Sequence, residues 1–174
     1  MTISFTINGQ PQSVQDDAGD IKLLDYMHEM MTPSLTGTKF CCGMGICRAC
    51  TVSMTKAPNP NAEPIVSCST ALATVNGADI TTIEGASDGD ALLPIQTAFL
   101  KHFSFQCGYC TPGFVMASQI FLDWLATAPV TEAELDAEIE DAIGDHICRC
   151  TGYVRYQEAL RETALAVINS EAAQ

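Results

Sequence analysis

Residues 42–50 read CGMGICRAC, and a fourth cysteine of the same group follows at position 68. Cys42, Cys47, Cys50 and Cys68 are separated by four, two and seventeen residues. Three ligands on one tight loop with a fourth from a distant segment is the plant-type spacing for a 2Fe–2S cluster. Structural zinc is the alternative, but zinc sites usually draw their thiolates as two pairs. The spacing therefore favours an iron–sulfur cluster.

The loop between these cysteines contains two glycines and is preceded by one extra cysteine. Gly43 and Gly45 let the chain wrap closely, so that backbone N–H groups approach the bound cluster. Cys41 stands directly beside Cys42 and could in principle be the ligand, but the spacing favours Cys42. We expect Cys41 to be a small buried thiol that binds no metal.

A second group of cysteines lies near the C-terminal end, in QCGYCTPG and ICRCTGY. Its members are Cys107, Cys110, Cys148 and Cys150. Taken alone, two pairs of cysteines could equally hold zinc. The single residue between Cys148 and Cys150 slightly favours a cluster, and both pairs precede predicted helices, whose N-termini stabilise thiolate charge.

Outward from the first group, the N-terminal half is predicted to be rich in β-strands. Hydrophobic residues alternate over positions 3–7 and lead into Asn8-Gly9, a strong hairpin signal. A partner strand is expected at 12–15, a short helix at Leu23–Met31, and further strands at 51–55 and 80–83. Residues 56–64 contain three prolines and are predicted to be a turn or surface loop.

The C-terminal half changes to a helical period. Helices are predicted at 95–102, 112–126, from Thr131 onward and at about 156–169, and Thr131 with Glu134 matches a capping box. The fold class is therefore α+β, with an α+β domain at 1–84, a small polar linker at 85–92 and a helical domain at 93–174.

Composition excludes several classes of protein. The net charge of −13 argues against a nucleic-acid binder, which needs a basic face. The charge-free run 103–122 contains too many polar groups to cross a membrane. Nine cysteines point to metal rather than disulfides, and the odd count leaves one over. No signal peptide opens the chain, so the cytoplasm is the expected compartment, with co-export alongside a signal-bearing partner as the alternative.

Taken together, these segments resemble the small iron–sulfur subunit, or the N-terminal iron–sulfur domains, of the xanthine oxidase and aldehyde oxidoreductase family. The resemblance covers nearly the whole chain and rests on TGTKF, CGMGICRACTV, SCSTAL, ITTIEG, QCGYCTPGFVM and ICRCTGY. It implies a plant-ferredoxin-like (β-grasp) domain followed by a four-helix bundle, each holding one 2Fe–2S cluster. The eight ligands implied are Cys42, Cys47, Cys50, Cys68, Cys107, Cys110, Cys148 and Cys150.

The resemblance also implies partners and a direction of electron flow. A large subunit carrying molybdopterin would hydroxylate an aldehyde or heterocycle with oxygen from water, and a further subunit would often carry flavin or haem. Electrons would leave the molybdenum through the bundle's cluster and then the ferredoxin-like one, with Gln106 and Cys150 against the pterin. Substrate contacts would lie in the large subunit, so no catalytic residue is expected here. A self-standing ferredoxin-like carrier and a zinc-stapled scaffold are the alternatives.

Two positions depart from the family pattern, which usually has glycine at both. Cys41 puts the local thiol chemistry in doubt, but not the cluster. Arg48 lies inside the ligand loop, so its positive charge is expected to favour the reduced cluster and raise its reduction potential. A solvated surface arginine is the alternative interpretation.

Overall fold

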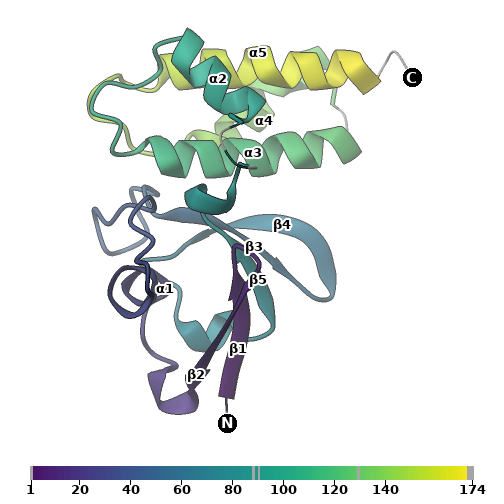
Figure 1. Cartoon of the computed structure of the whole chain (residues 1–174). Helices are drawn as coiled ribbons and strands as arrows, with labels where there is room; N and C mark the ends of the chain where they lie inside the picture. The colour runs from purple at the N-terminus through teal and green to yellow at the C-terminus, as the bar shows by residue number, and fades with distance from the viewer. Residues whose placement is uncertain (1, 88, 90, 129, 172–174) are drawn as a thin grey trace.

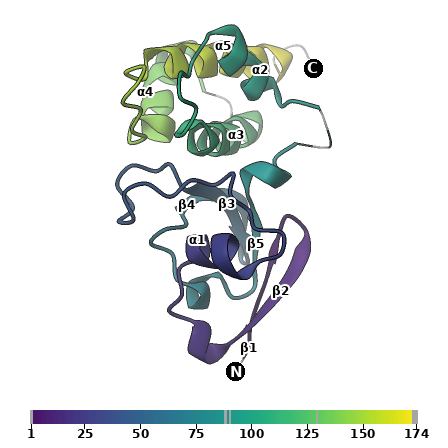
Figure 2. The same ribbon diagram turned by 60° about the vertical axis from the view of Figure 1, so that its left-hand side comes forward.

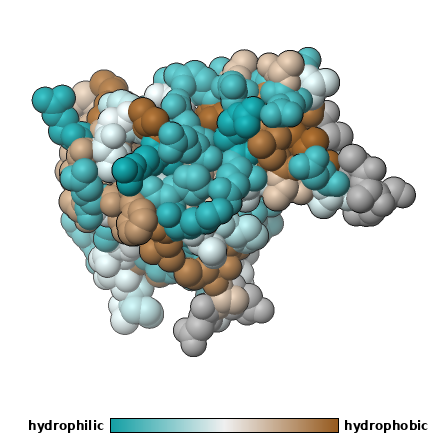
Figure 3. Space-filling model, turned by 90° about the horizontal axis from the view of Figure 1, so that it is seen from above, coloured by the Kyte–Doolittle hydropathy of each residue, from teal (hydrophilic) through white to brown (hydrophobic). Residues whose placement is uncertain are grey.

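The chain folds into a β-sheet domain and a helical domain stacked one on the other (Figure 1). This computed structural model describes residues 2–87, 89, 91–128 and 130–171. The α+β class expected from the sequence is confirmed. In the described part of the chain, no helix is both long and apolar enough to cross a membrane. The face seen from the helical end mixes hydrophilic and hydrophobic residues (Figure 3).

The first domain is built on one mixed sheet of five strands in the order β2-β1-β5-β3-β4. The strands are β1 (Thr2–Ile7), β2 (Gln10–Gln15), β3 (Thr51–Lys56), β4 (Asn59–Val66) and β5 (Ala78–Thr81). β1 and β5 run parallel, and the other pairs are antiparallel. The predicted hairpin is present, because Asn8 (φ 51°) and Gly9 (φ 73°) take the left-handed conformations that a tight two-residue turn needs.

A short helical segment covers one face of this sheet. It consists of α1 (Leu23–Asp25) and the π-helical turn η2 (Tyr26–Met30), where the sequence predicted one short helix. Leu23, Leu24 and Met27 are completely buried against the inward-facing residues of β1 and β5. Three short 3-10 turns complete the domain: η1 (Asp16–Ala18), η3 (Leu72–Val75) and η4 (Ile83–Gly85).

The prediction of a loop at 56–64 is wrong, since β4 occupies most of this range. β4 pairs with β3 in antiparallel register, with Pro64 opposite Ser53. The prolines are tolerated because β4 is an edge strand of the sheet, where a missing N–H need not interrupt a hydrogen-bond ladder.

The second domain packs its helices around one hydrophobic core. The helices are α2 (Pro94–Lys101), α3 (Thr111–Thr127), α4 (Glu132–Ile143) and α5 (Val154–Glu171). Each overlaps a predicted helix, and the capping box is present, with Glu134 accepting a hydrogen bond from the Thr131 N–H at 3.0 Å. The core includes Phe99, Phe114, Leu125 and Tyr156. Of the predicted linker, Asp88 and Asp90 lie outside the described residues.

The two domains meet where α3 lies across β3 and β4 (Figure 2). Gly113, in the first turn of α3, is the residue of closest approach. A Cβ atom at this position would lie 2.4 Å from the carbonyl oxygen of Arg48 and 3.2 Å from the backbone of Ala49. Only a glycine lets the helix pack this tightly on the loop that carries the first group of cysteines.

Candidate metal centres

The first cysteine group forms two pairs of thiols, with Cys42, Cys47 and Cys50 on the loop before β3 and Cys68 just after β4. The Cys47 N–H donates to the Cys42 sulfur at 3.4 Å, and the half-buried Cys42 lies at the outer end of the site. Cys50 and Cys68 lie side by side at the buried end, where each is in side-chain contact with the other. Ser67 holds the distant segment in place, because its hydroxyl donates to the Cys50 carbonyl at 2.8 Å.

The loop conformation turns backbone N–H groups toward this site. Gly43 (φ 68°), Gly45 (φ 77°) and also Arg48 (φ 56°) take left-handed conformations. Hydrogen bonding, first from the Cys47 N–H and then from Met44, lowers the pKa of the Cys42 thiol to about 6. Burial instead raises the pKa of the Cys50 thiol to about 12. Cys42 thus favours thiolate by itself, whereas Cys47 and Cys50, whose thiol pKa values are raised by burial, need a cation to hold them deprotonated.

Cys41 is exposed, so its predicted burial is wrong. The half-buried Cys42 lies next to it and has its sulfur within reach of the loop's N–H groups. This contact favours Cys42 over Cys41 as the residue that faces the site.

The second cysteine group gathers at the N-termini of α3 and α5, as predicted. Cys110 directly precedes α3, and Cys148 and Cys150 lie in the turn before α5. Cys110 and Cys148 contact each other on the inner side, and burial raises the pKa of the Cys110 thiol to about 12. Cys107 and Cys150 are exposed on the outer side, with their sulfurs 3.5 Å apart. This group therefore has an inner pair, with Cys148 buried and Cys110 half-buried, and an exposed outer pair.

The arrangement as pairs fits two-iron clusters better than single metal ions. Each iron of a 2Fe–2S cluster takes two thiolates, whereas structural zinc gathers four ligands around one ion. The pairs are Cys42 with Cys47, Cys50 with Cys68, Cys107 with Cys150, and Cys110 with Cys148.

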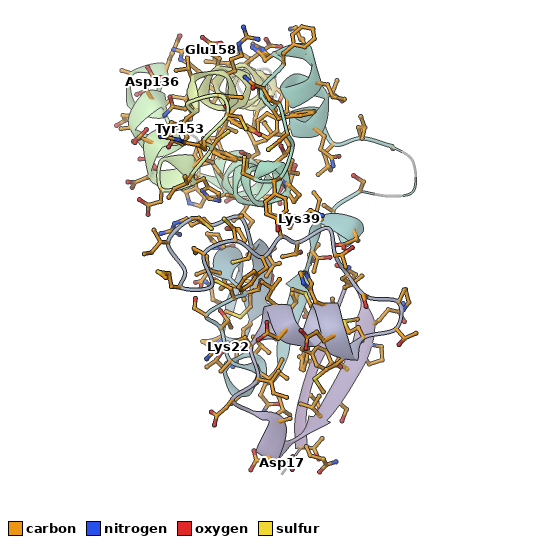
Figure 4. The ribbon with its side chains drawn as sticks, turned by 90° about the vertical axis from the view of Figure 1, so that its left-hand side faces the viewer. Asp17, Lys22, Lys39, Asp136, Tyr153 and Glu158 are labelled. Atoms are coloured by element: carbon orange, nitrogen blue, oxygen red, sulfur yellow. The ribbon has the colours of Figure 1, made fainter. Side chains whose placement is uncertain are left out.

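Several contacts join the two groups across the domain boundary. The Ile147 N–H donates to the Cys47 carbonyl at 3.2 Å, and Tyr109 donates its hydroxyl proton to the Phe40 carbonyl. Arg48 forms an ion pair with Asp145 at 2.6 Å. Figure 4 shows Lys39, next to Phe40, at the level where the two domains meet.

His146 lies at the same boundary, although its spacing in the sequence gave no sign of this. Its ring is buried and approaches the Thr51 hydroxyl at 3.3 Å. Burial, with Arg48 nearby, lowers the pKa of His146 to about 4, so the ring is neutral at neutral pH. Buried histidine is recognisable only from the fold, because one isolated His in a sequence carries no periodic signal.

The predicted pterin-contacting residues lie together on the outer side of the second group. Gln106 and Cys150 are both exposed. Among the residues that the structure describes, no hydrogen-bonding partner is found for the Gln106 amide, so it does not cap the neighbouring helix. Exposed hydrophobic side chains lie close in sequence to these cysteines: Phe103, Tyr109 and Ile147.

Comparisons with known proteins agree with this division into two sites. A 2Fe–2S iron–sulfur cluster binding domain matches residues 5–73, and a 2Fe–2S binding domain matches residues 82–161. Together these matches cover most of the chain.

Several relatives match nearly the whole chain. The chain is 37% identical to the nicotine 6-hydroxylase small subunit of Paenarthrobacter nicotinovorans, with 91% of this chain and 86% of that one covered. It is 36% identical to the isoquinoline 1-oxidoreductase subunit alpha of Brevundimonas diminuta, covering 93% and 97%. The quinoline 2-oxidoreductase structure from Pseudomonas putida 86 superposes with a TM-score of 0.76 at 32% identity, covering 99% and 96%. The chain therefore belongs to the small iron–sulfur subunits of the molybdenum hydroxylases, the xanthine oxidase and aldehyde oxidoreductase family.

Proposed function

We propose that this chain transfers electrons from the molybdopterin site of a large partner subunit to an acceptor, using the two thiol sites described above. Hydroxylation with oxygen from water releases two electrons and two protons for each substrate molecule. A 2Fe–2S cluster takes up and releases one electron, so two such sites accommodate both electrons of a turnover. The chain's own residues hold the clusters and do no chemistry on the substrate.

Eight cysteines are proposed as ligands, and Cys41 is left out. The ligands of the first site are Cys42, Cys47, Cys50 and Cys68, and those of the second are Cys107, Cys110, Cys148 and Cys150. In the first set Cys42 is half-buried and the other three are buried; in the second, Cys107 and Cys150 are exposed, Cys110 is half-buried and Cys148 is buried. Gly43 and Gly45 contribute the conformation that directs N–H groups to the first site.

The observation that carries the electron-transfer proposal is the hydrogen bond between the two sites. It joins the carbonyl of Cys47 to the N–H of Ile147, whose neighbour in the chain is Cys148. Covalent bonds with one hydrogen bond therefore link a ligand of one site to a ligand of the other. Such a continuous path conducts electrons better than a gap of the same length. A structural zinc scaffold has no need of it.

The direction of transfer follows from the two exposed edges. We propose that Gln106 and Cys150 face the pterin, because the free amide can both donate and accept hydrogen bonds. The loop of the first site has its own exposed side chains, Phe40, Met44 and Ile46, on which a flavin or haem subunit would dock. We propose the cytoplasm as the compartment, where thiols remain reduced and available to metal. Cell fractionation of the tagged complex tests this.

The composition of the purified complex tests the function. About four irons and four acid-labile sulfides are expected for each copy of this chain, together with a copurifying large subunit that contains molybdenum. Stoichiometric zinc with little iron would refute the cluster assignment. Full iron content without any partner would instead support a self-standing carrier.

A further inference from the structure

Tyr156 places a hydroxyl group inside the second cysteine site. It lies in the first turns of α5 and is completely buried. Its oxygen is 3.8 Å from the sulfur of Cys110 and 2.8 Å from the hydroxyl oxygen of Thr111. Tyr156 therefore brings a polar group to the Cys110 thiol, which packs against the hydrophobic core of the bundle.

Two aromatic rings fix the position of this hydroxyl. Phe114 stacks on the Tyr156 ring with centroids 3.9 Å apart and an angle of 5° between the planes. Phe99 meets the ring edge-on, at 4.9 Å and 89°. The ring cannot turn its oxygen away from Cys110 without breaking both contacts, so the hydroxyl is held in place before any cluster binds.

The direction of the hydrogen bonds follows from the charge on the sulfur. A cysteine that holds iron is a thiolate, which accepts hydrogen bonds and cannot donate one. A tyrosine hydroxyl ordinarily keeps its proton at neutral pH and can donate a hydrogen bond. The Tyr156 O–H then donates to the Cys110 sulfur, and the Thr111 hydroxyl donates to the Tyr156 oxygen. Each donor strengthens the next in such a chain, and the dry surroundings strengthen both.

We propose that Tyr156, supported by Thr111, is a positioning residue that raises the reduction potential of the second site. The inference rests on the proposed function, since it requires a cluster on Cys110. Reduction adds one negative charge, which spreads onto the ligand sulfurs. A hydrogen-bond donor therefore stabilises the reduced site more than the oxidised one. The consequence is a stronger electron acceptor at the site nearest the proposed pterin edge.

Tyr156→Phe in the full complex tests this, because it keeps the stacked ring and removes only the hydroxyl. A redox titration followed by electron paramagnetic resonance should show a three- to tenfold lower ratio of reduced to oxidised second site at a fixed ambient potential. That corresponds to a shift of about 30 to about 60 mV downward for a one-electron couple. The first site should keep its potential.

The matched control is Tyr153→Phe. Tyr153 lies only three residues earlier in the chain, and its exposed hydroxyl makes no hydrogen bond to any described residue. This variant should leave both potentials unchanged. Figure 4 shows Tyr153 at the surface of the helical domain.

A second pair of variants separates the hydroxyl chain from simple packing. Thr111→Val should lower the second potential by less than Tyr156→Phe, whereas Thr111→Ser should keep it. Pulsed electron paramagnetic resonance in ordinary and deuterated buffer identifies exchangeable protons coupled to the second site. Tyr156→Phe should have one such proton fewer than the wild type. Unchanged potential and unchanged proton coupling, with both clusters assembled, would overturn this inference and leave the proposed function intact. A wild-type complex without a second cluster would overturn both.

Discussion

The two thiol sites reach the same grouping of cysteines in different ways. In the first, Cys42, Cys47 and Cys50 lie within one loop, and local backbone conformation brings them together. In the second, the pairs are separated by thirty-seven residues and meet because α3 and α5 pack side by side. The geometry of the first site therefore depends mainly on local backbone conformation, and that of the second depends on the packing of helices. Damage to packing should affect the second site before the first.

The sites also differ in what surrounds their sulfurs. Backbone N–H groups approach Cys42, the exposed end of the first site. At the second site, backbone N–H groups approach Cys107 in the same way, and side-chain hydroxyls also approach the inner thiols, with Thr151 3.1 Å from the Cys148 sulfur and Tyr156 close to Cys110. Backbone donors depend on loop shape, whereas hydroxyl donors depend on single side chains. Point mutations should therefore adjust the second site more readily.

The largest expected effect tests the independence of the sites. Cys42→Ser should lose the first cluster, about two of four irons, while the second remains, because the bundle does not need the loop to gather its thiols. Iron assay and electron paramagnetic resonance measure this. Cys41→Ser is the matched control and should keep all four irons, since Cys41 is exposed and is not among the proposed ligands. Loss of iron in the control alone would exchange the two assignments.

A large but smaller effect is expected at the contact between the domains. Gly113→Ala should lower the free energy of unfolding by about 2–3 kcal/mol, because the added methyl group overlaps the Arg48 carbonyl. Denaturant unfolding of the complex, monitored by the release of iron, measures this loss of stability. Gly77→Ala is the control, at a glycine with φ +77° and no atom near the added Cβ. It should cost about 1 kcal/mol through backbone strain alone. Equal losses would mean that α3 does not press on the first loop.

Entry of electrons through the second site predicts an effect at Gln106. Gln106→Ala should slow reduction of the second cluster by substrate about tenfold, since one hydrogen bond to the cofactor is lost. Rapid-freeze spectroscopy after mixing with substrate measures the rate, and both clusters should remain assembled. If the first cluster is reduced earlier than the second, the order of the two regions is reversed.

The smallest effect concerns the ion pair that joins the regions. Asp145 lies 2.6 Å from Arg48 and offsets part of its charge. Arg48→Gly should still lower the first potential, by about 10–20 mV, as expected for a screened, exposed charge. Asp145→Asn should raise it, and both shifts should shrink at high salt. An unchanged reduction potential of the first site in both variants would show that Arg48 is only a surface residue.

Much of this protein could be predicted from sequence because its strongest signals are local. Cysteine spacing identified the first site, period and capping identified the four helices, and Asn8-Gly9 identified the first hairpin. Each depends on residues within a few turns of one another. Two local predictions were wrong, the loop at 56–64 and the burial of Cys41. In both cases the outcome depends on tertiary contacts: β4 is an edge strand, and Cys41 lies at the surface.

Only the tertiary structure decided how the parts meet. It placed prolines on an edge strand, set Gly113 against the first loop, buried His146 between the domains and joined Cys47 to Ile147 by a hydrogen bond. It also brought Tyr156 to Cys110, forty-six positions away. Sequence records the chemistry of each residue and its local conformational preferences. The packing of whole helices and sheets decides which distant residues come close, because the free energy of burial depends on the whole packed core and not on any one pair.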